Sequence, residues 1–168
     1  VSNQTITTTN SFVLDANPPV LSFWHWYNTE TNYDGGVLEI STNGGLSWTD
    51  IGSANFIQNG YNSTISTSYS NPLGGRSAWS GNNSAFVETK VSLAAYANQP
   101  NVKLRWRFGT DNSVAATGWN LDDINLTNIA KVKMRSGLFD NTNTRISYSD
   151  TSTIISAPPS VLLTVNLK

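Results

Sequence analysis

The residues with the clearest chemistry are acidic and lie where calcium ligands are expected. Calcium binds about six to eight oxygens, from carboxylates, backbone carbonyls and amide side chains. Asp34 directly precedes Gly35-Gly36, where glycine lets the backbone turn its carbonyls toward an ion. Asp122 alternates with Ile124 and Leu126, which predicts a carboxylate on the apolar side of a strand, where it must be paired, hydrogen-bonded or metal-bound. We predict a structural calcium ion with these ligands: Asp34, Asp122, Glu30 and Asp111.

A second interpretation of the acidic residues stays open. Asp122 would then accept hydrogen bonds from backbone N–H groups, and the other carboxylates would cap turns. Asp123 follows Asp122 and is expected to point outward into solvent. The two interpretations differ in one respect that a structure can test, since only a metal site requires the carboxylates to converge.

Residues suited to catalysis are few. The chain has one histidine and no cysteine, and neither a His-Glu-x-x-His nor a Gly-x-Ser-x-Gly motif is present. His25 lies between Trp24 and Trp26, which is typical of a core or hydrogen-bonded histidine rather than of a catalytic base. We predict a domain that is not an enzyme. Glycoside hydrolysis by two carboxylates across a cleft is the less favoured alternative.

An aromatic residue in a polar segment is the candidate for ligand binding. Residues 58–83 are rich in Gly, Asn and Ser, and long loops of this kind in compact domains often serve binding or capping. Trp79 would stack on a sugar, and three neighbours in sequence would complete the site: Arg76, Tyr61 and Tyr69. The alternative is that Trp79 only anchors the loop, and the remaining tryptophans are expected in the core.

Composition limits the function classes further. The chain has 168 residues, a net charge of −1 and only 12% charged residues, so its overall charge favours neither nucleic acid nor an anionic membrane as partner. Six Trp, six Tyr and six Phe supply enough aromatic side chains for a folded core. No apolar run is long enough to cross a bilayer. The sequence begins with Val and shows no signal peptide, so we expect a mature or excised piece of a longer protein.

The elements that must position these side chains are strands. Val20–Tyr27 is apolar on both faces, as a central strand would be, and Val102–Phe108 alternates apolar with basic residues. Val37–Ser41 leads into Asn43-Gly44, the strongest hairpin signal in the chain. No segment has a helical apolar period of useful length. The pattern predicts an all-β antiparallel sandwich with about eight to twelve short strands.

Two pairs of segments resemble a known family. Residues 19–25 lead into 33–41, and residues 102–111 lead into 118–124, in an order and spacing similar to the jelly-roll domains of MAM and cleaved-adhesin modules. Such modules occur in secreted bacterial proteins, including accessory domains of immune-inhibitor-A-like metallopeptidases. The resemblance covers about residues 12–126 and implies a concanavalin-like or galactose-binding-like sandwich. Relatives in this family often carry structural calcium, which supports the ion predicted above.

The resemblance and the composition together predict an accessory role outside the cell. We expect a secreted or cell-surface module for adhesion or for targeting a substrate or glycan, and a purely structural spacer is the alternative. Its partners would be a glycan, a cell-surface or matrix protein, or neighbouring domains of its parent chain. We expect one jelly-roll domain over residues 1–128. Residues 129–168 would add strands at 129–135, 144–148, 153–155 and 161–167, either to this sandwich or to a neighbouring module.

Overall fold

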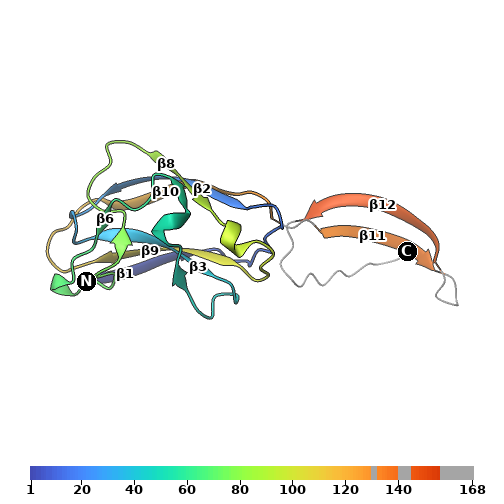
Figure 1. Ribbon diagram of the computed structural model, residues 1–168, viewed down its shortest axis with the longest axis horizontal. Helices are drawn as coiled ribbons and strands as arrows, with labels where there is room; N and C mark the ends of the chain where they lie inside the picture. Colours follow the sequence, from blue (N-terminus) through green and yellow to red (C-terminus); the bar gives the residue numbers. More distant parts are fainter. Residues whose placement is uncertain (130–131, 140–144, 156–168) are drawn as a thin grey trace.

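The computed structural model describes residues 1–129, 132–139 and 145–155, and these form an all-β protein (Figure 1). Two antiparallel four-stranded sheets make up its main body, which confirms the predicted fold class. The first sheet has the order β1 (Ser2–Thr7), β9 (Lys103–Thr110), β3 (Gly35–Ser41) and β4 (Thr49–Asp50). The second has the order β10 (Gly118–Leu126), β2 (Val20–Asn28), β8 (Val87–Ser92) and β5 (Phe56–Gln58).

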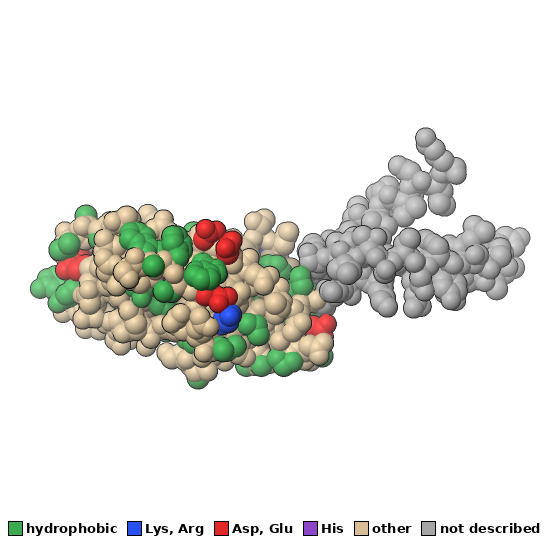
Figure 2. Space-filling model, turned by 90° about the horizontal axis from the view of Figure 1, so that it is seen from above, with side chains coloured by type: hydrophobic (Ala, Val, Ile, Leu, Met, Phe, Trp, Pro, Cys, Tyr) green, Lys and Arg blue, Asp and Glu red, His purple; other side chains and the backbone are tan. Residues whose placement is uncertain are grey.

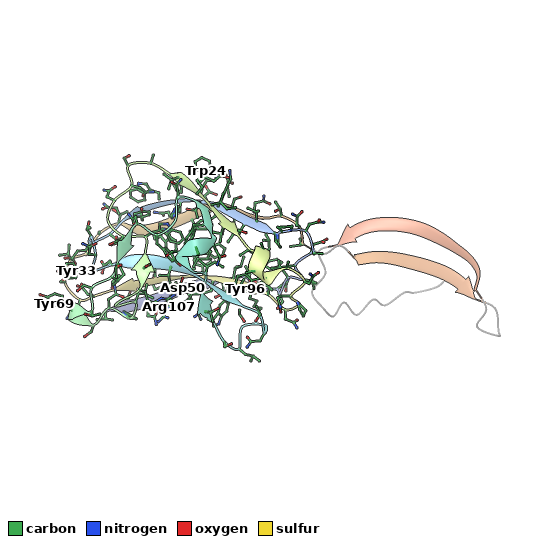
Figure 3. All side chains as sticks on the ribbon, in the orientation of Figure 1. Trp24, Tyr33, Asp50, Tyr69, Tyr96 and Arg107 are labelled. Carbon is green, nitrogen blue, oxygen red and sulfur yellow. The ribbon has the colours of Figure 1, made fainter. Side chains whose placement is uncertain are left out.

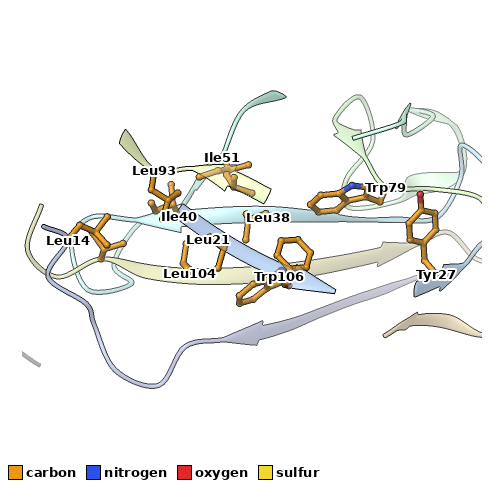
Figure 4. Close-up of a cluster of buried hydrophobic side chains, with 13 residues drawn as sticks. Leu14, Leu21, Tyr27, Leu38, Ile40, Ile51, Trp79, Leu93, Leu104 and Trp106 are labelled. Carbon is orange, nitrogen blue, oxygen red and sulfur yellow. The ribbon is translucent and has the colours of Figure 1, made fainter. Parts of the chain in front are cut away.

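The core lies between these two sheets (Figure 4). In β2 the inward positions are fully or almost fully buried, as the period of two predicts: Leu21, Phe23, His25 and Tyr27. The first sheet contributes the facing side chains of β3 and β9, namely Leu38, Ile40, Leu104 and Trp106. Burying aromatic and branched side chains from both sheets is what stabilises the sandwich, at about 25 cal/mol per Å² of apolar surface.

Strand β3 is buried along its whole length because a second layer covers its outer face. A short hairpin, β6 (Ser63–Thr64) and β7 (Ser77–Ala78), packs its apolar side chains against Val37 in a small second cluster. Gly36 exchanges two backbone hydrogen bonds with Trp79, each 2.9 Å long. A Cβ atom on Gly35 would lie 2.6 Å from the Trp79 carbonyl oxygen, so this close approach requires glycine. Residues 58–83 are therefore part of the packed body.

Three single-turn 3₁₀ helices complete this part of the chain: η1 (Ser53–Asn55), η2 (Ser68–Ser70) and η3 (Ala94–Tyr96). Among the described residues no helix has the length and apolar character that crossing a membrane requires. Toward the C-terminus, β11 (Val132–Phe139) and β12 (Arg145–Ile155) pair antiparallel in a sheet of their own. The strand predicted at 161–167 lies outside the described residues, and the division of the chain at residue 128 stays a prediction.

Candidate metal site

Three of the four predicted metal ligands converge at one end of the first sheet. Glu30 and Asp34 lie in the connection between β2 and β3, and Asp111 directly follows β9. Strands β3 and β9 pair from Gly35 opposite Gly109, so the register of the sheet brings the residue before β3 next to the residues after β9. Asp34 and Asp111 are 77 residues apart in sequence, but the pairing of the two strands brings them into contact.

The connection before β3 is a tight turn that places two carboxylates side by side. The backbone N–H groups of Tyr33 and Asp34 donate to the Glu30 carbonyl, at 3.1 and 2.9 Å. These two bonds close a tight turn in which Asn32 lies in the left-handed region, at φ 68°. The Ser80 hydroxyl donates to the Asp34 carbonyl at 2.6 Å and fixes the turn to the segment after β7. The turn therefore holds a carboxylate oxygen of Glu30 within 4.8 Å of one of Asp34.

One oxygen from each of Glu30, Asp34 and Asp111 lies within 4.8 Å of the others. The Asp111 N–H donates to Asp34 Oδ1 at 2.9 Å. Ser113 approaches Asp111 Oδ1 with both its N–H and its hydroxyl, at 2.8 and 2.9 Å. The same hydroxyl lies 3.0 Å from Glu30 Oε2, and since a hydroxyl carries one hydrogen it can donate to only one of these carboxylates at a time.

One carboxylate oxygen of Asp111 has no hydrogen-bond donor among the described residues. The residue is 5% exposed, and within the described part of the chain its buried Oδ2 has no hydrogen-bond partner. A buried carboxylate oxygen without a donor is costly, because it has lost water and gained nothing. An ion seated against Asp111 Oδ2 would remove that cost.

The electrostatics of the cluster would favour a bound cation. Burial raises the pKa of the Asp34 carboxyl, and the nearby Asp111 and Glu30 carboxylates raise it further against the lowering effect of the Asp111 N–H bond. Across residues 1–129 none of the three carboxylates forms a salt bridge with Lys or Arg. Like charges held together without a counter-charge destabilise the fold at neutral pH, and a divalent cation would reverse the sign of this effect.

A cavity of about 370 Å³ opens beside the cluster. Asp34 and Asp111 form part of its wall, and the loop after β9 forms much of the rest. Side chains with hydroxyl or amide oxygens also line it: Asn28, Thr29, Thr110, Asn112 and Ser113. Carboxylate, hydroxyl and amide oxygens are hard ligands and suit calcium better than a transition metal. The cavity also gives an ion and its waters a route to the carboxylates.

Asp122 does not join this cluster, and its predicted position on an apolar strand face is wrong. A β-bulge interrupts β10 between Asp122 and Asn125, with Asp123 at φ 46°, so the alternation on which the prediction depended is broken. Asp122 is exposed, and Ile124 is 47% exposed. Asp122 also lies four residues along β10 from Gly118 at the cavity, which is roughly 13 Å in a strand.

The proposed sugar-stacking residue is also in the wrong place. Trp79 is 2% exposed, packs edge-on against Phe23 and donates its indole N–H to the Asn59 carbonyl at 3.0 Å. It anchors the excursion from inside the core, as the alternative predicted. The sequence could not distinguish the two because the covering hairpin brings residue 79 back onto β3.

The other three predicted ligand residues do not form one surface with Trp79. The Tyr61 hydroxyl bonds to the backbone of Leu38, with the Leu38 N–H donating to it at 2.9 Å. Arg76 forms salt bridges with Glu39 and Asp50, both 2.6 Å long. Tyr69 is exposed at 62% and lies near the end of the molecule in Figure 3. Tyr69 is the most exposed of the four.

His25 is fully buried and takes part in a chain of hydrogen bonds. The indole N–H of Trp119 can only donate, so His25 Nδ1, 3.0 Å away, is the acceptor and Nε2 carries the proton. Nε2 then donates to the Thr89 hydroxyl at 3.0 Å, which donates to the Asn59 carbonyl at 2.8 Å. Burial lowers the pKa of His25 to about 4, so the ring is neutral at physiological pH. The prediction of a core histidine is confirmed.

Glu39 is a second buried carboxylate, but unlike Asp111 it is fully paired. It is 3% exposed and accepts hydrogen bonds from Arg76 at 2.6 Å and from Arg105 Nε at 2.6 Å. Burial alone would raise the pKa of Glu39, but the hydrogen bonds and charges of the two arginines outweigh it and hold the pKa below its usual value. The basic residues of β9 are thus largely used inside the molecule.

The chain has a weak similarity to a known peptidase. No family model matches the chain. A search of curated proteins finds Bacillopeptidase F of Bacillus subtilis (strain 168), which is 23% identical over 113 residues. The match covers 67% of this chain but only 6% of that much longer protein. This weak similarity suggests that the chain is an accessory domain of a larger protein.

Proposed function

We propose that this chain is a non-catalytic accessory domain of a larger exported protein, stabilised by a calcium ion bound to Glu30, Asp34 and Asp111. The observation that carries the proposal is that Asp111 lies beside two further carboxylates while its buried Oδ2 has no hydrogen-bond partner among the described residues. Calcium bound there would tie the turn before β3 to the loop after β9. Its function would be to hold this end of the sandwich rigid.

The distribution of reactive groups supports an accessory rather than a catalytic role. The sole histidine is neutral, buried and engaged at both ring nitrogens. One oxygen from each carboxylate of the cluster lies within 4.8 Å of the others, which suits a shared ion. The similarity to a short part of a peptidase fits a module attached to a catalytic domain.

The test is calcium binding by the intact domain. Wild-type protein stripped with a chelator should bind calcium in isothermal titration calorimetry, and its melting temperature should rise on adding the metal. At a free calcium concentration 100 times the Kd, the stabilisation is about 2.7 kcal/mol. For a domain of this size that corresponds to roughly 5–11 °C.

Asp122→Asn supplies the matched control. It makes the same chemical change as Asp34→Asn, on an exposed residue outside the cluster. Asp34→Asn should weaken calcium binding at least tenfold, while Asp122→Asn should leave it unchanged. Equal binding by all three proteins, or no change in melting temperature with calcium, would overturn the proposal.

A further inference from the structure

One tryptophan in the middle of a sheet is exposed on the outer face of the sandwich. Trp24 is on β2, which has β10 on one side and β8 on the other. Its neighbours Phe23 and His25 are fully buried in the core, so Trp24 points to the outer face, and it is 41% exposed. Figure 3 shows Trp24 at the outer side of the body, where β8 and β2 run.

Polar side chains flank this indole on both neighbouring strands. Asp122 of β10 and Glu88 of β8 are the direct cross-strand partners of Trp24. Directly paired residues share a face and hold their Cβ atoms about 4.5–5.5 Å apart, so both carboxylates stand beside the ring. Lys90 forms a 2.8 Å salt bridge with Glu88 and adds a donor on the same strand face. We call Trp24, Asp122, Glu88 and Lys90 the Trp24 face.

The Trp24 face continues along β2 toward the end of the molecule where the cavity lies. Trp26 is the next outward residue, half-buried, and its cross-strand partner is Asn120. Phe86 immediately precedes β8 and is 45% exposed. Figure 2 looks onto this side of the sandwich, where hydrophobic side chains gather with acidic groups on both sides and a basic group next to one of them.

We propose that the Trp24 face binds a neutral sugar chain. The C–H face of a sugar ring carries slight positive charge and packs on the negative face of an indole, which offers a rigid apolar surface. Carboxylate, ammonium and amide groups at the edges of the ring can exchange hydrogen bonds with the hydroxyls around that sugar. Trp24 supplies the stacking surface. The hydrogen-bonding groups come from Asp122, Glu88, Lys90 and Asn120.

Charge and composition select this ligand over others. Asp122 and Glu88 outweigh Lys90, so the face is net negative and would repel sulfated or uronic polymers. A protein docked by hydrophobic contact would bury these charged groups without partners, at a cost. Glu88 is already paired, which reduces the attraction for a cationic peptide. Hydroxyls bond to such groups without requiring a counter-charge.

The inference gives the accessory role a ligand class, and it does not depend on the ion. Trp24 pairs with Asp122, roughly 13 Å along β10 from the residue that borders the cavity. Calcium-loaded protein should be passed over insoluble cellulose, xylan, mannan and chitin, with heparin as the anionic comparison. If the protein is retained on a polysaccharide but calcium does not change its melting temperature, the calcium proposal fails and the sugar proposal stands. If calcium raises the melting temperature but no polysaccharide retains the protein, the sugar proposal fails and the calcium proposal stands.

Variants locate the contact. We expect wild-type protein to be retained on at least one neutral polysaccharide and not on heparin, and Trp24→Ala to weaken retention at least tenfold. Leu46→Ala is the control, since Leu46 is an apolar residue 89% exposed on a different turn. If Trp24→Ala melts at a lower temperature than wild type, the milder variants Asp122→Asn and Trp24→Phe replace it in the test. We expect each of them to weaken retention on the polysaccharide several-fold.

The proposal is overturned by three results. These are no retention of wild-type protein on any of the four neutral polysaccharides, retention on heparin only, and retention by folded Trp24→Ala equal to wild type.

Discussion

Asp111→Asn should change stability in opposite directions with and without calcium. In the metal-free protein the substitution removes a negative charge that lies within 4.8 Å of both Asp34 and Glu30. Two unit charges about 5 Å apart repel by roughly 3 kcal/mol at an effective dielectric constant near 20. Burial and the two neighbouring carboxylates raise the pKa of Asp34, which is the direction that such repulsion produces. We expect metal-free Asp111→Asn to be more stable than metal-free wild type by about 1–2 kcal/mol.

With calcium present the order should invert. Wild type gains about 2.7 kcal/mol at 100 times its Kd, whereas the variant, having lost a charged ligand, gains little at the same concentration. The assay is urea unfolding of both proteins at pH 7, once with chelator and once with calcium. Asp122→Asn should show no inversion, because its carboxylate lies outside the cluster.

The pH dependence of the metal-free protein supports the same reasoning. A carboxyl whose pKa is raised on folding binds more protons in the folded state, so stability falls as pH rises from the ordinary Asp value through the raised one. Metal-free Asp34→Asn should lack this component.

A metal-free Asp111→Asn that is less stable than wild type at pH 7 would refute the reasoning, because it would mean that Asp111 stabilises the fold without an ion.

Three further predictions concern the body that supports the site. Because burial lowers the pKa of His25 to about 4, the unfolded chain binds its proton first as pH falls, and we expect a loss of up to roughly 3 kcal/mol between pH 6.5 and 4, measured by urea unfolding. His25→Gln should flatten that slope, and an unchanged slope would contradict the assignment. Glu39→Gln should cost about 1–3 kcal/mol, since it removes the charge shared by Arg76 and Arg105 while Arg76 keeps its salt bridge with Asp50, and no measurable cost in the same assay would show that the pairs are worth little. Trp79→Ala should cost about 3–5 kcal/mol and also weaken calcium binding, because the adjacent Ser80 fixes the turn before β3, and an unchanged affinity would mean that the hairpin does not shape the metal site.

The sequence predicted the inner faces of the sheets well and the outer faces poorly. Alternation in β2 identified Leu21, Phe23 and His25 as neighbours on one face, because a strand has a fixed period of two. It could not say which of two aromatic faces meets solvent. Trp24 was expected in the core and is exposed, while Trp79 was expected in a loop and is buried, because a distant hairpin and not local pattern decides which surface is covered.

The candidate site was predictable in its residues but not in its geometry. Asp34 before two glycines marked a turn, and the acidic residues marked hard ligands. The sequence does not single out Ser113, since serine is common in the chain and only the fold brings this one to Asp111 and Glu30. Asp122 was misplaced because a bulge adds a residue to one strand and shifts everything after it, and no pattern in the sequence marks that bulge.

The pairing of Gly35 with Gly109 has a consequence for how the domain unfolds. The site needs Asp34 and Asp111, which are 77 residues apart in sequence, to be in register. A slip of one residue between β3 and β9 would turn the side chains to opposite faces and separate the carboxylates. The ion can therefore bind only after the sheet has formed. It cannot help the two strands to find their register during folding. Calcium should slow unfolding and leave the refolding rate almost unchanged, because it binds only the completed structure.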